Sequence, residues 1–423
     1  MSTFLFILGR KPLISLAEII AIWGEKCIKG FEDELALVEL DEEDPRVRNI
    51  ESTLLRMGGT MKIAKVYQEF DREPSIETLI EKSYAGVHSR IMALKKVIFA
   101  ANTYNLPQRS NKLVIDFLKI YKKYLTELGY MSRYLNKSNA NVESAVALTE
   151  NIIRKGVEFN FAMVEGKFYG TYTVAAQDFR LYAERDYHKP YRDNQAGMLP
   201  PKLAQIMIGL GEGMCKDVAT NLLYDPFCGS GTILMESLLC RINCIGSDIR
   251  QETVIGAQEN CEWIQKNFEH TQHYTFKTFH QDVTSMNPEE ILKQHNPSMV
   301  VSESFLGPYF KKKPTVAETR QVQQNLGDLY KKAIQKFAQL HVPIVFAIAA
   351  HRNGATDYVF NEQIIEGIKS SGLKFTPLLP NWILKRFTPE QALTKGYCLD
   401  RHTLIYDRED AMVGREIFVL MPQ

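Results

Sequence analysis

The sequence predicts an α/β fold in which a large parallel sheet follows two smaller units of mixed strands and helices. Three observations support this prediction. The chain has 423 residues, too many for one ordinary hydrophobic core, so two or three domains are expected. From about residue 195 onward, short apolar runs alternate with amphipathic segments, the order that builds an open parallel sheet. Earlier in the chain the predicted strands and helices are interleaved within smaller units.

Residues 1–75 are expected to form the first of the smaller units. Apolar runs of strand length alternate there with segments of helical periodicity, an arrangement typical of a ferredoxin-like α+β module. The expected strands are 3–8, 34–40 and 61–70, and the expected helices are 14–23 and 45–57.

Residues 76–178 are expected to form the second unit. A strand over 96–101 precedes a helix over 111–128, whose apolar residues recur at helical spacing. A second helix over 143–155 is closed by Gly156. Two apolar runs, 160–165 and 171–175, flank a turn that contains glycine and predict a hairpin.

Charge is distributed unevenly along the chain. The formal net charge of +1 excludes a protein that is basic throughout. Between Asn105 and Ala140, however, seven basic residues stand against Asp116 and Glu127, a local balance of 7 − 2 = +5. A solvated helix face is the simpler explanation, and a surface that faces phosphates is the alternative. The basic residues are Arg109, Lys112, Lys119, Lys122, Lys123, Arg133 and Lys137.

The third unit, residues 179–423, contains the repeated strand-then-helix pattern. Four strands each lead into a helix, which indicates a parallel sheet. Two further apolar strands, 402–406 and 416–420, close the chain, and a closing pair of this kind often places an antiparallel strand at the sheet's edge. The expected strand and helix pairs are 222–224 with 231–240, 244–247 with 253–268, 299–301 with 318–340, and 342–349 with 361–371.

A glycine-rich turn follows the first strand of this sheet and is the strongest motif in the chain. It runs Asp-Pro-Phe-Cys-Gly-Ser-Gly-Thr over residues 225–232. Ligands of open α/β sheets bind outside the carboxyl ends of the strands. Gly229 and Gly231 allow a ligand to approach the backbone there, and a helix begins behind them at about Thr232.

The residues of the turn discriminate among three cofactors. A nucleoside triphosphate site requires a lysine after the second glycine, which is absent, and Asp225 would repel phosphate. A dinucleotide site requires a third glycine, where Leu234 stands. S-adenosylmethionine remains, because it has no phosphate and is positive around its sulfonium and ammonium groups. We expect Asp225, Phe227, Gly229 and Gly231 to contact it.

Two more acids follow the next two strands. Asp248 ends the second strand about 20 residues after the turn, the spacing expected of a carboxylate that binds ribose hydroxyls. Asp282 follows the third strand and is placed to accept from the adenine amino group. Each taken alone is equally well explained as a capping or loop residue. Their order after successive strands favours a cofactor site.

From about residue 177 onward the chain resembles the class I methyltransferases that modify amino groups of RNA bases. Within that class it is most similar to the tRNA guanosine-10 N2-methyltransferase family. The front half resembles that family's ferredoxin-like domain followed by a THUMP domain, through the order of its elements and Gly156-Val157-Glu158. Besides the turn and the two acids, the matching motifs are Gln177-Asp178, Arg185-Asp186, Pro190-Tyr191-Arg192-Asp193 and Gly197-Met198-Leu199-Pro200-Pro201-Lys202-Leu203-Ala204.

The resemblance implies a domain organisation and two further cofactor contacts. It implies a ferredoxin-like domain over 1–75, a THUMP-like RNA-binding domain over 76–178 and a Rossmann-like methyltransferase domain over 179–423. Within the last, residues 179–200 are expected to link the domains and to cover the cofactor. Met198 and Leu199 are the residues of that segment expected to contact S-adenosyl-L-methionine.

The chain departs from the family pattern at the exit of the fourth strand. Amino-group methyltransferases carry Asp or Asn, two prolines and an aromatic residue there, whereas this chain has Ser302-Glu303-Ser304-Phe305. An acceptor must bind the hydrogens of the exocyclic amine while the aromatic ring stacks on the base. Ser302 stands at the place of the acid, so we expect Glu303, displaced by one residue, to be the acceptor and Phe305 to stack.

The sequence therefore predicts an S-adenosylmethionine-dependent RNA base methyltransferase, acting on tRNA at a guanine N2. A catalytically silent tRNA-binding protein with a retained cofactor pocket is one alternative, and a DNA amino-methyltransferase is another. The resemblance allows a small activator protein as a partner besides tRNA. The candidate RNA-binding residues are Lys119, Lys122, Lys123, Lys311, Lys312 and Lys313.

Location and cysteine usage are also predicted from the sequence. The first apolar run, residues 4–8, is too short for a signal peptide or a membrane span, so a cytoplasmic protein is expected. The seven cysteines show no CxxC spacing, so reduced thiols are expected and a metal site is not.

Overall fold

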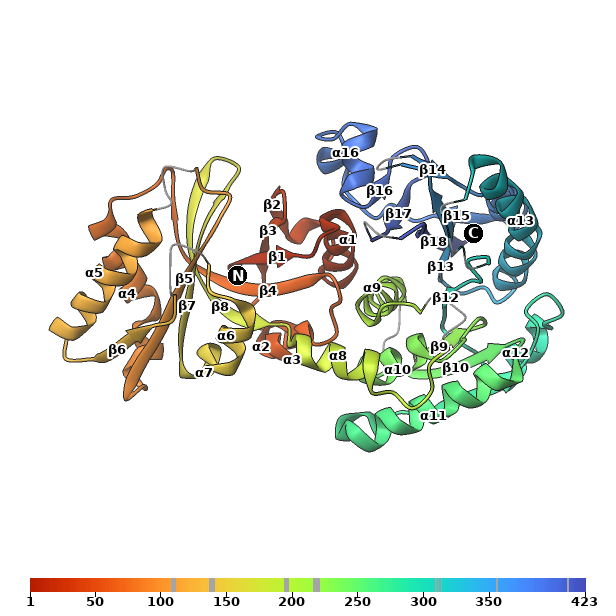
Figure 1. The fold of residues 1–423 in the computed structure, drawn as a ribbon, viewed down its shortest axis with the longest axis horizontal. Coiled ribbons are helices and arrows are strands. Elements are labelled where there is room, and N and C mark those ends of the chain that lie inside the picture. Colours follow the sequence, from red (N-terminus) through yellow and green to blue (C-terminus); the bar gives the residue numbers. More distant parts are fainter. Residues whose placement is uncertain are drawn as a thin grey trace. The chain divides into compact units, whose positions relative to one another are not determined.

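The computed structural model describes residues 1–107, 112–136, 141–193, 198–215, 221–308, 310, 312, 314–354, 357–408 and 411–423. The chain divides into two compact units (Figure 1). The N-terminal unit comprises Met1–Gly9, Lys26–Leu55 and Thr60–Asp178, and the C-terminal unit comprises Arg10–Glu25, Arg56–Gly59 and Phe179–Gln423. Where the sequence predicted three domains, the contacts between residues define two units.

The N-terminal unit is built on one eight-stranded sheet with the order β2-β3-β1-β4-β8-β7-β5-β6. The neighbouring strands are antiparallel except for β5 with β6 and β5 with β7. Because β4 pairs with β8, the sheet runs without a break through the two predicted N-terminal domains. The strands are β1 (Ser2–Leu8), β2 (Ile28–Glu32), β3 (Leu35–Leu40), β4 (Thr60–Phe70), β5 (Lys96–Tyr104), β6 (Met131–Tyr134), β7 (Gly156–Val164) and β8 (Lys167–Ala176).

The helices of this unit follow the predicted pattern in part. Helix α4 (Ile76–Met92) and helix α5 (Leu113–Glu127) bury apolar residues against β5 and β7 in an aromatic core. The sequence reasoning missed α4 and β2. Each of the helices predicted over 45–57 and 143–155 is interrupted, giving α2 (Pro45–Arg48) and α3 (Ile50–Leu54), and α6 (Ser144–Thr149) and α7 (Ile152–Lys155). The second interruption falls at Asn151, which has a left-handed backbone.

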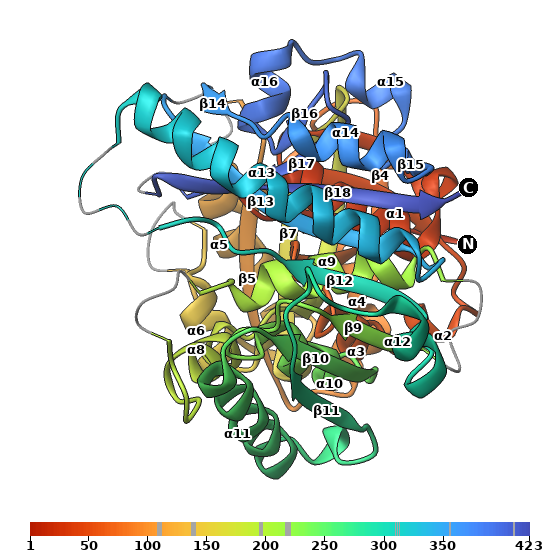
Figure 2. The same ribbon diagram turned by 90° about the vertical axis from the view of Figure 1, so that its right-hand side faces the viewer.

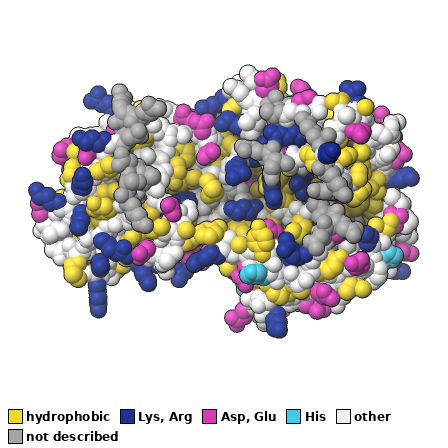
Figure 3. All heavy atoms as spheres, viewed as in Figure 1, with side chains coloured by type: hydrophobic (Ala, Val, Ile, Leu, Met, Phe, Trp, Pro, Cys, Tyr) yellow, Lys and Arg dark blue, Asp and Glu magenta, His cyan; other side chains and the backbone are white. Residues whose placement is uncertain are grey.

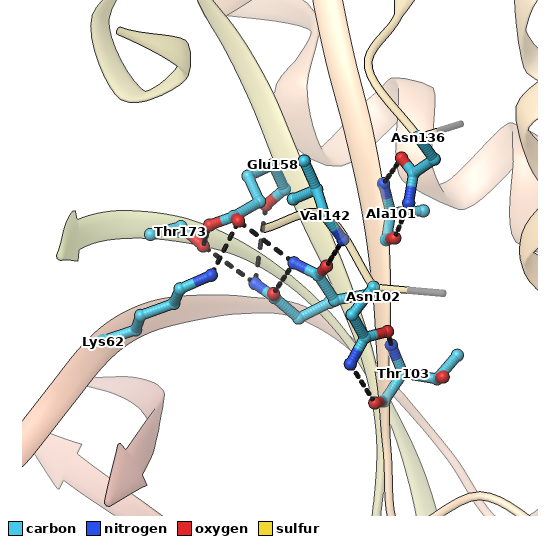
Figure 4. Close-up of polar contacts among 10 residues, drawn as sticks. Lys62, Ala101, Asn102, Thr103, Asn136, Val142, Glu158 and Thr173 are labelled. Atoms are coloured by element: carbon cyan, nitrogen blue, oxygen red, sulfur yellow. Dashed lines mark hydrogen bonds and ion pairs between the residues drawn. The ribbon is translucent and has the colours of Figure 1, made fainter. Parts of the chain in front are cut away.

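A buried polar network joins four strands of the N-terminal sheet (Figure 4). Lys62 of β4 pairs with the Glu158 carboxylate of β7 at 2.7 Å, and Asn102 of β5 donates to the same oxygen at 3.1 Å. Asn102 also donates to Asn160, which donates in turn to Thr173 of β8. A charged pair this deeply buried is tolerated because its polar partners are satisfied. The network therefore ties β4, of the first predicted domain, to strands of the second.

The C-terminal unit is built on a second sheet with the order β11-β10-β9-β12-β13-β18-β17-β16, extended by β14 on β13 and β15 on β18. Strands β9 to β13 pair in parallel, whereas β18 is antiparallel to both of its main neighbours. The strands are β9 (Leu222–Asp225), β10 (Asn243–Asp248), β11 (Phe276–His280), β12 (Met299–Glu303), β13 (Ile344–Arg352), β14 (Tyr358–Val359), β15 (Leu373–Phe375), β16 (Tyr397–Cys398), β17 (Thr403–Tyr406) and β18 (Val413–Pro422).

The sequence suggested an antiparallel strand at the edge of this sheet, but the antiparallel strand lies inside it. Strand β18 is inserted between β13 and β17. Seven consecutive residues of β18, from Gly414 to Leu420, are buried, and a strand buried along such a length is stable only with neighbours on both sides.

Helices cover both faces of this sheet (Figure 2). Helix α13 packs Tyr330, Ile334 and Phe337 against Phe346 of β13, and α14 packs on α13. On the other face α9 contacts α1, α10, β12 and β13. The helices are α1 (Pro12–Trp23), α8 (Phe179–Tyr187), α9 (Pro201–Glu212), α10 (Thr232–Leu239), α11 (Gln251–Asn267), α12 (Pro288–Gln294), α13 (Val316–Ala338), α14 (Gln363–Ser370), α15 (Asn381–Leu384) and α16 (Pro389–Thr394).

Two segments from the start of the chain belong to the C-terminal unit. Helix α1 packs on α9, and its buried Glu18 accepts hydrogen bonds from the backbone N–H of Gly58 at 2.8 Å and of Gly59 at 2.9 Å. A Cβ on Gly58 would lie 1.8 Å from the carbonyl oxygen of Lys202, so only glycine fits against α9. A chain that began at residue 179 would therefore lack part of this unit's packing.

None of the helices in the described part of the chain is long and apolar enough to cross a membrane. Within the same ranges, no three His, Cys, Asp or Glu side chains come together as a metal site. All seven cysteines are free, and six of them are buried.

Candidate functional site

The glycine-rich turn lies between β9 and α10, at the carboxyl ends of the parallel strands. Both glycines have positive φ angles, +49° for Gly229 and +81° for Gly231. A Cβ on Gly231 would lie 3.0 Å from the Cβ of Ala257 in α11, so this glycine allows two helices to pack. A Cβ on Gly229 would meet nothing within 4 Å, so the turn presents its backbone to open space there. The turn therefore leaves room for a ligand at Gly229.

Asp248, the last residue of β10, holds this turn in place. Its Oδ2 accepts from the backbone N–H of Gly229 at 3.0 Å. Its Oδ1 accepts from the backbone N–H of Arg250 at 2.9 Å and from the hydroxyl of Thr253 at 3.0 Å. The carboxylate is thus oriented by three donors while remaining half-buried. It can act as an acceptor for a ligand only in this fixed orientation.

The sequence predicts that the adenine of the cofactor binds near Asp282. Asp282, just after β11, uses its Oδ1 to accept from the backbone N–H and the hydroxyl of Thr284, both at 2.8 Å. Ile249 follows Asp248 and is 61% exposed, an apolar side chain left in solvent. The sequence reasoning did not single out Ile249. Its signal was its position directly after the second strand's acid, where an apolar residue can lie against a purine ring.

Asp225 is the most deeply buried acid of the site, with 1% of its surface exposed. The hydroxyl of Ser302 donates to its Oδ1 at 2.6 Å, and the backbone N–H of Phe227 donates to the same oxygen at 3.2 Å. Burial raises the pKa of the Asp225 carboxyl to about 8, and these two hydrogen bonds limit the rise. A cation placed beside Asp225 would favour its ionised form. This environment fits the positive end of S-adenosylmethionine.

Phe227 and the residues expected to cover the cofactor complete the set of predicted contacts on this side of the site. The ring of Phe227 stacks on Phe346 of the core, with centroids 6.1 Å apart, so part of its predicted role is packing. Leu199 is buried and Met198 half-buried, directly before α9 begins at Pro201.

Ser302 and Glu303 form the end of β12, next to Asp225. The Ser302 hydroxyl donates to Asp225, so its hydrogen points toward the predicted cofactor side of the site. Glu303 accepts from Arg415 Nε at 2.8 Å, an ion pair whose side chains are 12% and 9% exposed. Phe305 is 55% exposed, and its carbonyl accepts from the Tyr330 hydroxyl at 2.8 Å. A carboxylate and an open aromatic ring thus follow one another at this strand exit.

Arg415 was not anticipated from the sequence. It lies on β18, 112 residues after Glu303, and no local pattern connects the two. The ion pair was visible only once β18 was placed beside β13.

The candidate RNA-binding lysines belong to two places. Lys119, Lys122 and Lys123 are exposed on α5. In Figure 3, Lys and Arg side chains lie over the end of the N-terminal unit that carries α4 and α5. Lys123 lies 3.8 Å from Glu127, and Lys122 lies over the ring of Tyr134. In the other place Lys312 is exposed, whereas Lys311 and Lys313 lie outside the described residues, as do Arg109 and Lys137.

Comparison with known proteins identifies the kind of domain. Residues 189–289 match the UPF0020 family, described as an RMKL-like methyltransferase domain. The tRNA (guanine(10)-N2)-dimethyltransferase of Pyrococcus abyssi is 38% identical over 65 residues, which cover 15% of this chain and 18% of that enzyme. The enzyme of the same name from Methanocaldococcus jannaschii is 24% identical, covering 38% of this chain and 52% of its own length. The matches thus span about half or less of these relatives.

The fold has a relative among solved structures. The crystal structure of TrmN from Thermus thermophilus aligns over 100% of both chains with a TM-score of 0.51 and 10% sequence identity. At that identity the likeness shows the fold alone. The family match and the distant relatives confirm the resemblance found in the sequence, and a methyltransferase domain of this kind takes S-adenosyl-L-methionine as its methyl donor.

Proposed function

We propose that this chain, whose residues 189–289 match an RMKL-like methyltransferase domain, methylates an exocyclic amino group of an RNA base, the N2 of a guanine in tRNA. The observation that carries the proposal is the end of β12. There a carboxylate, Glu303, and an exposed aromatic ring, Phe305, lie at the same sheet edge as Asp225 and the Gly229 turn. The names of the distant relatives support tRNA as the substrate.

The chemistry explains why these residue types are needed. S-adenosylmethionine supplies the methyl group as its carbon–sulfur bond breaks. The base's amino nitrogen is a weak nucleophile, since its lone pair is delocalised into the ring. Glu303 accepts a hydrogen bond from the amine, stabilises the positive charge that develops on the nitrogen as S-adenosylhomocysteine leaves, and takes the proton that the nitrogen then loses. Phe305 stacks on the base and fixes the direction of attack.

Ser302 and the cofactor-side residues have different roles in this proposal. Ser302 donates to Asp225, is fully buried and carries no charge that could stabilise the amine as it becomes positive, so Glu303 is the better acceptor. Asp225 and Gly229 face the positive end of the cofactor, Asp248 takes ribose hydroxyls and Asp282 meets the adenine. Phe227, Gly231, Met198 and Leu199 shape the rest of the pocket.

We assign RNA binding to the front of the chain. In this proposal a ferredoxin-like part (residues 1–75, apart from Arg10–Glu25 and Arg56–Gly59, which pack in the C-terminal unit) and a THUMP-like part (residues 76–178) share one sheet and dock the tRNA, while the base is flipped into the pocket. The exposed lysines of α5 contribute phosphate contacts. Lys312, next to the base-binding end, contributes another.

One observation favours a second candidate function, a catalytically silent tRNA-binding protein. Glu303 already has a cationic partner in Arg415, and the prolines that follow the acid in related enzymes are replaced. If this pair withdraws the carboxylate from the base, the chain binds RNA and cofactor without transferring a methyl group.

Single-turnover transfer of labelled methyl groups to unmodified tRNA separates the two functions. We expect transfer by the wild type, and a loss on the order of 10²–10³-fold in Glu303→Gln, the typical effect of removing one preorganised group. Glu290→Gln, an exposed carboxylate of α12, is the matched control and should transfer at the wild-type rate. Mass spectrometry of the nucleosides then identifies the base and atom. If the wild type transfers no methyl group to any tRNA, the second candidate, a catalytically silent tRNA-binding protein, is correct.

A further inference from the structure

The Arg415–Glu303 pair is built by three adjacent strands. Glu303 of β12 is in register with Ala347 of β13, and Ala349, two residues further along β13, is in register with Arg415 of β18. Arg415 therefore reaches along and across β13 to place Nε 2.8 Å from Glu303 Oε1. Its Nη2 lies 3.5 Å from the carbonyl oxygen of Met198, in the segment that precedes α9. One guanidinium thus contacts both the base-binding end and the covering segment.

The pair is difficult to explain as a stabilising element. Desolvation of two charges offsets most of their attraction, so that apolar residues often serve stability equally well. Arg415 contacts Glu303 through a single nitrogen, and a guanidinium has five N–H groups in a planar fork. The pair also stands at the carboxyl end of β12, where the proposed reaction takes place, rather than within the apolar core.

We propose that Arg415 is a positioning residue for methyl transfer, an inference that rests on the proposed function. It holds Oε1 of Glu303, so that Oε2 is the oxygen directed to the amine. Its remaining N–H groups offer a donor beside that acceptor. An acceptor next to a donor matches a base that has an amino group adjacent to a ring nitrogen acceptor, and uracil has no such group. The pair therefore replaces the missing prolines in fixing the acceptor and selects bases that carry an amino group.

Three variants test this role, all measured by single-turnover methyl transfer to tRNA. Arg415→Met should lower the rate on the order of 10²-fold, as expected when an orienting group is removed, and Arg415→Lys should lower it less because it keeps a charge and one donor. In Glu303→Gln/Arg415→Met the second change should add almost nothing to the loss in Glu303→Gln alone, because Arg415 acts through Glu303.

Separate measurement of rate and binding distinguishes positioning from a general structural effect. In Arg415→Met the single-turnover rate at saturating tRNA and S-adenosylmethionine should fall, whereas the Kd values for both should stay close to those of the wild type. A loss caused by poor folding would weaken binding of both together with the rate. The matched control is Arg401→Met, which breaks another Arg–Glu pair, Arg401–Glu416, whose side chains are 12% and 0% exposed. It should lower stability without changing the single-turnover rate of the folded protein.

The outcomes also separate this inference from the proposed function. If the wild type transfers no methyl group to any RNA, both are wrong. If the wild type transfers methyl groups and both Arg415→Lys and Arg415→Met transfer them at the wild-type rate, Arg415 has no positioning role, while the proposed function stands. If Arg415→Met does not fold, Arg415→Lys and Glu303→Gln/Arg415→Lys decide: a full wild-type rate in Arg415→Lys, or additive losses in that double variant, contradicts the inference.

Discussion

Replacing Gly229 by alanine tests whether the glycine turn faces a ligand. Gly229 has a φ of +49°, in the left-handed region, and its Cβ would meet nothing within 4 Å. The backbone strain of an L-residue there costs about 1 kcal/mol, partly offset by the lower entropy of the unfolded chain. We therefore expect Gly229→Ala to lower the free energy of unfolding by about 1 kcal/mol or less. The protein should fold normally.

Ligand binding should respond much more strongly than stability. The added methyl group would occupy the open space beside the turn, where we place the positive end of the cofactor. We expect the Kd for S-adenosylhomocysteine, measured by titration calorimetry, to rise by at least about tenfold, equivalent to roughly 1.4 kcal/mol.

Gly246→Ala is the matched control, since its Cβ would lie 2.6 Å from Leu234 Cδ1 and 2.8 Å from Cys228 Cβ. That substitution should destabilise the fold by about 1–3 kcal/mol through overpacking. Wild-type affinity in a well-folded Gly229→Ala would refute the placement of the cofactor. A stability loss as large as that of Gly246→Ala would refute the open space at Gly229.

Three further predictions concern other parts of the chain. Burial raises the pKa of Glu18 from 4.5 to about 7, so the folded state holds a proton that the unfolded state releases, and stability falls as the pH rises from about 4.5 through 7. This rise in the pKa corresponds to about 3 kcal/mol, and Glu18→Gln should remove that part of the pH dependence in denaturant titrations. In α9, the Cβ added by Gly209→Ala would have its nearest neighbour at 3.5 Å, so this substitution should raise the free energy of unfolding by about 0.5–1 kcal/mol through the higher helix propensity of alanine. The Cβ added by Gly211→Ala would lie 3.0 Å from Met299 and from Val301, so that substitution should bring no gain. Charge reversal at Lys119 and Lys122 should weaken tRNA binding and flatten its dependence on salt, and an unchanged salt slope would mean that α5 is merely solvated.

Local patterns were sufficient to predict most elements of the C-terminal unit. The strand ends at Asp225, Asp248 and Glu303 were identified because a buried parallel strand produces a short apolar run and the turn after it requires glycine or a polar residue. The same reasoning predicted continuous helices over 45–57 and 143–155. It missed the left-handed Asn151, because a single residue's φ leaves no periodic signal.

The sequence by itself determined the chemistry available at the site: acids and glycines at successive strand ends, and a serine and a glutamate where the family resemblance led us to expect an acid and a proline. Only the tertiary structure decided how those groups are used. It joined Ser302 to Asp225 and Arg415 to Glu303, and it placed α1 against α9 through Glu18 and Gly58. These partners are 40 to 112 residues apart along the chain. Their meeting depends on the strand order of the sheet and on shape at close contact, which hydrophobic periodicity does not encode.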